Sequence, residues 1–260
     1  MLRRLEDYVR RLHQAEGYKE VRSPAILSKS LWEKSGHWEK YQDLMYVAED
    51  PEQPMAVKPM SCPGHIAIFA QKKRSYRELP FKQFEFGHVH RREMSGSLNG
   101  WLRLRGFVQD DSHVICAKEQ ILPVISDFVR MVEKAYKDFG FESWEWKISL
   151  RPEKRAGSDE IWDAAEEALR AACRGLRIQA EEVEGDGAFY GPKLEVVLKD
   201  RLGRKWQCGV AQVDFVLPNR FGLSFQGKEH AEVPVMIHHA VLGSLERWLS
   251  VLMEHHGLLY

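Results

Sequence analysis

The 260-residue chain balances 38 lysines and arginines against 38 aspartates and glutamates, which excludes a global basic field but leaves room for a local basic groove that binds nucleic acid. Its 44% hydrophobic content is enough to bury a large core, and no stretch approaches the ~20 apolar residues of a membrane span. The four cysteines form no C-x-x-C pair, so we expect a single cytoplasmic domain over residues 1–260 without disulfides.

The first half of the chain predicts two helices, each followed by a strand. Apolar residues at helical spacing over residues 2–12 indicate a helix that ends at Gly17, and a short strand follows over residues 19–22. A longer apolar stripe predicts a helix over residues 121–139, and the alternation over residues 144–150 predicts a strand.

The second half predicts a helix, a hairpin and a closing helix. Ser158 is a candidate N-cap with acidic residues in the turn after it. Strands over residues 194–199 and 205–217, joined by a turn at 200–203, form the hairpin, and residues 240–255 carry apolar residues on one helical face. Because strands and helices follow no regular βαβ rhythm, we expect an α+β fold with an antiparallel sheet flanked by helices.

One segment has nearly the spacing of a phosphate-binding P-loop. Residues 222–229 fit this pattern until Glu229, which stands where a serine or threonine should bind magnesium. No helical pattern follows, and Pro234 comes soon after. We therefore interpret the match as chance.

A second segment has the composition of a phosphate site. Arg91, Arg92 and Glu93 run directly into the Gly/Ser-rich residues 95–100. Arginine offers a planar fork for phosphate oxygens, and glycine lets backbone approach a ligand closely. A solvated hairpin with surface ion pairs is the alternative, and composition alone favours it.

A polar strand is predicted next. The alternating side chains that share one of its faces are Arg103, Arg105, Phe107, Gln109, Asp111 and His113. Such a face suits a ligand-binding cleft better than a core, although an exposed strand would also explain it. Histidine occurs 11 times, and Cys62 would also fit as a small buried residue, so spacing alone does not predict a metal site.

Several blocks, taken in order, resemble the threonyl-tRNA synthetase family, whose members are class II synthetases. They are residues 58–65 (KPMSCPGH), 91–97 (RREMSGS), 105–113 (RGFVQDDSH), 151–155 (RPEKR), 157–160 (GSDE), 187–193 (GAFYGPK), 207–209 (QCG), 212–215 (QVDF), 234–238 (PVMIH) and 242–247 (LGSLER). The resemblance covers that family's catalytic core, and we expect neither its editing domain nor its anticodon-binding domain within these residues.

The resemblance implies a catalytic zinc. By similarity, Cys62, His113 and His238 are its protein ligands, with one position left open for the substrate. Zinc bound by both the amino and the hydroxyl group of threonine would reject valine, which lacks the hydroxyl, while serine remains the expected error. Asp111 would accept the hydroxyl proton.

The resemblance also implies roles for residues that bind ATP and threonine. The catalytic pair would be Arg91, which bridges the α-phosphate and the carboxylate, and Arg247, which covers adenine and reaches the γ-phosphate. The ATP-binding residues implied are Arg91, Glu93, Arg103, Phe107, Lys193, Gln207 and Arg247, and those for threonine are Gln109, Asp111, Tyr190 and Gln212. Magnesium would assist.

The function implied is a threonine–tRNA ligase core that forms threonyl-adenylate and passes threonine to the 3′ end of tRNA(Thr). The class II fold agrees with the predicted sheet, and the opening segment to Pro24 resembles the first class II motif, which implies a homodimer. The positions that depart from the family pattern are Arg92, Asn99, Val210 and His239. A stand-alone paralogue that loads a carrier protein is the alternative. A non-catalytic regulator is disfavoured because the implied catalytic residues are present.

Overall fold

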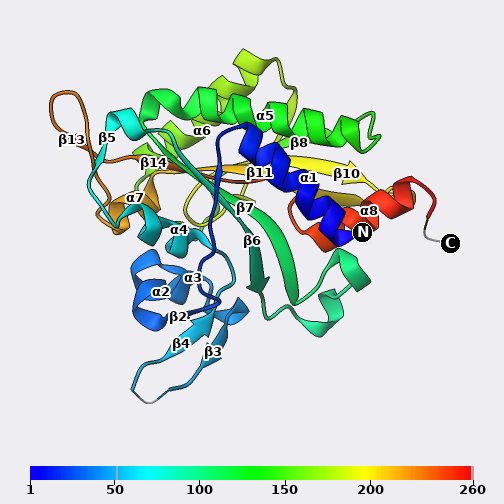
Figure 1. Ribbon diagram of the computed structural model, residues 1–260, viewed down its shortest axis with the longest axis horizontal. Coiled ribbons are helices and arrows are strands. Elements are labelled where there is room, and N and C mark those ends of the chain that lie inside the picture. The colour runs from blue at the N-terminus through cyan, green and yellow to red at the C-terminus, as the bar shows by residue number, and fades with distance from the viewer. Residues whose placement is uncertain (51, 259–260) are drawn as a thin grey trace.

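A computed structural model describes residues 1–50 and 52–258, with an eight-stranded sheet at the centre of the molecule (Figure 1). In spatial order its strands are β1 (Lys19–Glu20), β6 (Phe81–His90), β7 (Gly106–Cys116), β14 (Val235–Ala240), β11 (Lys205–Asp214), β10 (Lys193–Lys199), β8 (Glu145–Ser149) and β9 (Ala180–Val183). The six inner strands pair antiparallel, and β1 and β9 join the edges in parallel. The predicted antiparallel sheet is confirmed, with a parallel pair added at each edge.

Helices cover one face of this sheet and leave much of the other face to the remaining elements. The covering helices are α1 (Leu2–Ala15), α5 (Ile121–Asp138), α6 (Asp159–Leu176) and α8 (Leu245–His255), and together with the sheet they form the main hydrophobic core. The opposite face packs against α4 (Cys62–Phe69) and α7 (Val216–Arg220) through a second, smaller apolar cluster. Figure 1 shows α5 and α6 side by side along the sheet.

Two small sheets complete the structure. The first contains β2 (Ile26–Ser28), β4 (Met55–Val57) and β3 (Tyr46–Ala48), and it lies beside α2 (Lys29–Ser35) and α3 (His37–Lys40) in the lower part of Figure 1. The second contains β13 (Ala231–Glu232), β12 (Phe225–Gln226) and β5 (Arg74–Ser75). The rejected P-loop segment forms β12 and leads into β13 instead of a helix. In the described part of the chain, no helix is long and apolar enough to cross a membrane.

The first three predicted helices and the hairpin are confirmed, with small changes in their limits. Gly17 ends α1 with a φ of 81°, and Ser158 is the N-cap residue of α6. The apolar stripe of α5 is buried against the sheet. The hairpin pairs β10 with β11 across the predicted turn. The strand expected over residues 19–22 stops at Glu20, because Ser23 turns inward to bind Glu85 with its backbone N–H at 2.6 Å.

The closing helix was predicted to begin at residue 240, which is wrong. Residues 235–240 form β14, and α8 begins at Leu245, after Ser244 caps it by accepting a hydrogen bond from the N–H of Arg247 at 3.2 Å. The intervening turn is held by the buried carboxylate of Asp110, which accepts hydrogen bonds from three successive N–H groups at 2.8 to 2.9 Å. An apolar pattern cannot reveal this long-range contact.

The predicted strand over residues 205–217 is too long at its C-terminal end. β11 ends at Asp214, whose Oδ1 accepts hydrogen bonds from the N–H groups of Val216 at 2.7 Å and Leu217 at 2.9 Å. These bonds satisfy the free N–H groups at the start of α7. The polar strand expected from Arg103 likewise begins only at Gly106, because residues 100–102 form a 3₁₀ turn.

Candidate functional site

Two adjoining hollows, together called the cleft below, open on the sheet face opposite the main helices. One has a volume of about 460 Å³ and the other about 120 Å³. The residues that line both are Arg91, Gln109, Gln207 and Val210. Of the other residues predicted to form the site, Cys62, Asp111, His113, Tyr190, Lys193, Gln212 and His238 line the larger hollow, and Glu93, Arg103, Phe107 and Arg247 line the smaller one. The structure therefore brings all the predicted site residues together.

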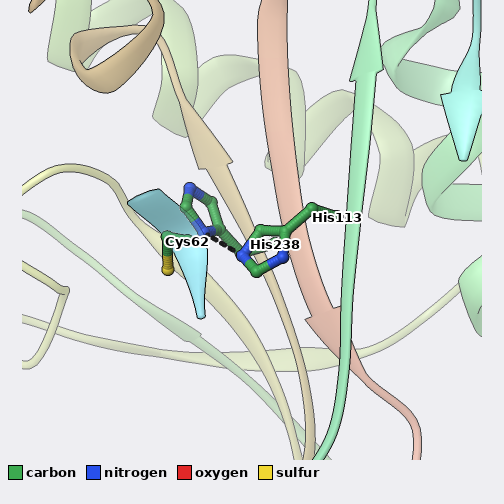
Figure 2. A group of neighbouring side chains, drawn as sticks. All are labelled: Cys62, His113 and His238. Atoms are coloured by element: carbon green, nitrogen blue, oxygen red, sulfur yellow. Dashed lines mark hydrogen bonds between the residues drawn. The ribbon is translucent and has the colours of Figure 1, made fainter. Parts of the chain in front are cut away.

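Three of these side chains form a cluster that could ligate a metal ion. Cys62 is the first residue of α4, while His113 on β7 and His238 on β14 are direct cross-strand partners. One potential ligand atom from each residue lies within 4.8 Å of the other two. Figure 2 shows the two imidazole rings joined by a hydrogen bond, with Cys62 beside them.

The two histidines direct one nitrogen each at a common point. His113 Nε2 lies 2.9 Å from His238 Nδ1, and the other nitrogen of His238 lies 2.8 Å from Oδ2 of Asp214. Both rings are buried. A thiol and two imidazoles, all buried at the wall of the larger hollow, form a donor set that suits zinc over magnesium. The residues present therefore fit a zinc ion.

Burial controls the protonation of this cluster. Burial, followed by the charges of Asp111 and Asp214, raises the pKa of the Cys62 thiol well above its usual value. Burial, followed by the neighbouring His65 and His238, lowers the pKa of His113. His113 is therefore neutral near pH 7 and able to ligate, whereas Cys62 must lose its proton when a metal binds.

Asp111 lies on the wall of the cleft beside the cluster. Its Oδ2 accepts a hydrogen bond from the backbone N–H of Ser61 at 3.1 Å, and its Oδ1 lies 3.8 Å from His113 Nδ1. Burial raises its pKa. The alternation predicted from the sequence places Asp111 on the same face of β7 as His113, and the structure confirms this.

Tyr190 closes the larger hollow from the side of β11. Its hydroxyl donates a hydrogen bond to Oε1 of Gln212 at 2.7 Å, and its ring lies 4.8 Å from that of His238. The next residue, Gly191, passes so close to β11 that an added Cβ would lie 2.1 Å from the carbonyl oxygen of Val213. Only glycine permits this approach.

Arginines concentrate around the smaller hollow. The guanidinium of Arg91 lies 5.2 Å from the centre of the Phe107 ring, and Arg103 forms an ion pair with Glu93 at 2.9 Å. Arg247 donates hydrogen bonds to the carbonyl oxygens of Leu102 at 2.8 Å and Gln207 at 2.9 Å.

This grouping of cations has an electrostatic consequence. Burial, with the repulsion of Arg103 and Arg91, lowers the pKa of Arg247. Like charges held at this density favour an anionic ligand, such as a phosphate chain, that would offset their repulsion.

A β-bulge explains how Gln207 and Val210 both reach the cleft. The register between β10 and β11 shifts so that one extra residue lies on β11 between Gln207 and Val210. An extra residue re-aims the side chains on either side of it. Of the departures from the family pattern, Val210 and His239 both line the larger hollow, and the buried ring of His239 has its Nε2 2.7 Å from the hydroxyl of Tyr18 on the helix side.

Sequence reasoning missed two residues next to the metal cluster. Asp214 contacts His238, and alternation along β11 places it on the same face as Gln212, which was a usable signal. His65 lies 2.7 Å from His113 through the Nδ1 atoms, and its position three residues after Cys62 on α4 places both on one side of that helix.

Comparisons with known proteins were made on this geometry. Residues 46–256 match the family model described as tRNA synthetase class II core domain (G, H, P, S and T). A threonine–tRNA ligase from Herminiimonas arsenicoxydans is 51% identical over 254 residues, and one from Gluconacetobacter diazotrophicus is 52% identical over 256. Each alignment covers 97% of this chain but 40% of the relative, so the chain spans less than half the length of these proteins.

Solved synthetase structures are also similar to this chain. The crystal structure described as the RNA-binding domain of threonyl-tRNA synthetase from Cryptosporidium parvum Iowa II superposes with a TM-score of 0.93 at 40% identity, covering 97% of this chain and 64% of that one. A prolyl-tRNA synthetase from Giardia lamblia superposes with a TM-score of 0.72 at 17% identity, a likeness of fold alone.

Proposed function

This chain belongs to the class II tRNA synthetase core-domain family, and we propose that it activates L-threonine with ATP as the catalytic core of a threonine–tRNA ligase. One observation carries the proposal: a Cys-His-His metal cluster and a group of arginines line one continuous cleft. The first suits an amino acid with a hydroxyl group, and the second suits a triphosphate. Relatives named threonine–tRNA ligase support the same activity.

In the first step the threonine carboxylate attacks the α-phosphorus of ATP, and pyrophosphate leaves. Arg91 lies between the two hollows and is placed to hold the carboxylate and the α-phosphate together. Arg103, Arg247 and Lys193 add fixed positive charge along the cleft, which stabilises the charge that develops on the transferred phosphorus. Magnesium would neutralise the leaving pyrophosphate. Phe107 and Glu93 would flank the adenine from the smaller hollow.

Amino-acid selection falls to the larger hollow. Cys62, His113 and His238 would hold zinc, which supplies an open coordination position for the amino and hydroxyl groups of threonine. Asp111 would accept the hydroxyl proton, and Gln109, Tyr190 and Gln212 would shape the rest of the pocket. Valine is close to threonine in shape, so an apolar pocket alone would separate the two poorly.

We propose that the acceptor is the 3′ end of tRNA(Thr), whose terminal hydroxyl attacks the adenylate and releases AMP. A homodimer is also proposed, from the likeness of residues 2–24 to the first class II motif. Transfer to a carrier protein is the alternative acceptor, and the relatives named threonine–tRNA ligase do not favour it. Both acceptors require the same activation of threonine by ATP, and they differ in the final step, in which threonine leaves the adenylate.

Two measurements, of tRNA charging and of adenylate formation, separate the two candidate acceptors. Incubation with radiolabelled threonine, ATP and tRNA(Thr) should yield threonyl-tRNA, and removal of zinc by a chelator should abolish the yield. If the adenylate forms but no tRNA is charged, a non-tRNA acceptor is favoured. If no amino acid supports adenylate formation, the proposals of tRNA charging and of transfer to a carrier protein both fail.

A further inference from the structure

His65 contacts the metal cluster from a position that the proposed reaction does not use. Its Nδ1 lies 2.7 Å from Nδ1 of His113, and both rings are fully buried. The rings meet edge to face, with centroids 4.6 Å apart. A neutral imidazole carries one N–H, so one nitrogen of this pair must donate and the other must accept.

A metal ion bound between His113 and His238 would decide which nitrogen donates. His238 presents Nε2 to the carboxylate of Asp214 at 2.8 Å, so its proton lies there and its Nδ1 lone pair is free. That lone pair faces Nε2 of His113 at 2.9 Å, where a metal ion would replace the hydrogen bond between the two rings. Both facing nitrogens can bind one metal ion only if His113 carries its proton on Nδ1. Nδ1 of His65 must then be the acceptor.

The surroundings of the other ring nitrogen of His65, Nε2, agree with the assignment of Nδ1 as the acceptor. If Nδ1 accepts, the proton of His65 lies on Nε2, which faces Oε2 of Glu85 at 3.9 Å and has no hydrogen-bond partner in the described structure. Glu85 is itself fixed, because Lys58 donates to its Oε1 at 2.6 Å and Ser23 to the same oxygen at 2.8 Å. The carboxylate is therefore held where it favours the proton on Nε2.

We propose that His65 is a positioning residue that sets the tautomer of His113, so that its Nε2 and Nδ1 of His238 can ligate a metal together. His238 is oriented directly by a carboxylate, whereas His113 is contacted by a histidine whose Nε2 faces the buried Lys58–Glu85 pair at 3.9 Å. Partners of this kind fix the ring and raise metal affinity by about 10- to 100-fold. The inference rests on the proposed metal site but not on threonine being the substrate.

Two substitutions at His65 test whether its hydrogen-bond acceptor at the Nδ1 position matters, as distinct from the volume of its side chain. His65→Asn places a carbonyl oxygen near the position of Nδ1 and keeps an acceptor for His113, whereas His65→Gln moves its amide towards the position of Nε2. Zinc and cobalt affinities of the full chain are measured by competition with a chromophoric chelator. We expect His65→Asn to bind within about threefold of the unsubstituted protein and His65→Gln to bind about 10- to 100-fold more weakly. Equal affinities in the two variants, whether high or low, would contradict the proposal.

A second measurement needs no substitution. In protein labelled with ¹⁵N-histidine, two- and three-bond ¹H–¹⁵N couplings report which ring nitrogen carries the proton. With zinc bound, we expect the proton of His113 on Nδ1 and that of His65 on Nε2. A proton on Nδ1 of His65 would overturn the assignment. If the unsubstituted chain binds neither zinc nor cobalt, the proposed metal site itself fails, which is a different outcome.

Discussion

His113 Nε2 and His238 Nδ1 lie 2.9 Å apart on neighbouring strands, with the thiol of Cys62 beside them. The antiparallel register of β7 and β14 fixes this relationship, because the two histidines are directly opposed. The donor pair is therefore a property of the sheet and is held by buried residues of β7 and β14. A rigid scaffold of this kind suits a site that must hold a metal ion in a fixed geometry.

Cys62→Ala should abolish zinc retention, because it removes the thiolate from a cluster that has two nitrogen donors. Metal content is measured after dialysis against a weak chelator. Cys173→Ala makes the same chemical change at a buried residue of α6, outside the metal cluster, and should keep the metal. Zinc retained by Cys62→Ala would refute its assignment as a ligand.

Arg91→Lys should lower kcat for adenylate formation by about 10²- to 10³-fold, because lysine keeps the charge but loses the planar fork. The exposed neighbour Arg92 donates to the carbonyl oxygen of Asp43 at 3.0 Å, so Arg92→Lys is the matched control. Steady-state pyrophosphate exchange measures both. Equal effects of the two substitutions would argue against a special role for Arg91.

Gly191→Ala should destabilise the fold by about 1–3 kcal/mol, because the new Cβ would overlap the carbonyl oxygen of Val213. Gly96→Ala is the control, since no heavy atom lies within 4 Å of its added Cβ. Urea unfolding measures both variants. An unchanged midpoint for Gly191→Ala would show that the loop can move away from β11.

Glu85→Gln should lower the free energy of unfolding by about 3–5 kcal/mol, because it leaves the ammonium of Lys58 buried without its partner. Burial alone would raise the pKa of Glu85, but His65 and Lys58 outweigh it and hold the pKa below its usual range. A depressed pKa gives stability that is present above the unfolded-state value of about 4.3 and is lost as the pH falls below it.

The same pair predicts a pH dependence. The free energy of unfolding should fall between about pH 5 and pH 3, and the double variant Lys58→Met/Glu85→Leu should show a shallower fall. Urea titrations at several pH values provide the measurement. Identical slopes for the two proteins would mean that Glu85 does not contribute to acid sensitivity.

Local patterns predicted the four longest helices and five of the eight strands of the central sheet, but not β6, β9 or β14. The apolar stripe of α5 and the hairpin of β10 and β11 depend on neighbours in sequence, so periodicity and turn residues were sufficient. The start of α8 was wrong because the turn before it is held by Asp110, more than a hundred residues away. Long-range hydrogen bonds of this kind leave no local signal.

The residues of the site also divide into those that local patterns predicted and those that only long-range contacts reveal. Alternation placed Phe107, Gln109, Asp111 and His113 on one face, and the structure agrees. The metal cluster unites α4, β7 and β14, and spacing could not bring these together, so resemblance to a family was needed. The contacts of His65 and Asp214 with that cluster emerged only from the geometry.

The central claim is that this cleft activates threonine, and amino-acid-dependent ATP–pyrophosphate exchange tests it most directly. The zinc-loaded chain is assayed with each of the common amino acids in turn. We predict rapid exchange with threonine, slower exchange with serine and almost none with valine. Exchange with valine at the rate of threonine, or no exchange with any amino acid, would contradict the account.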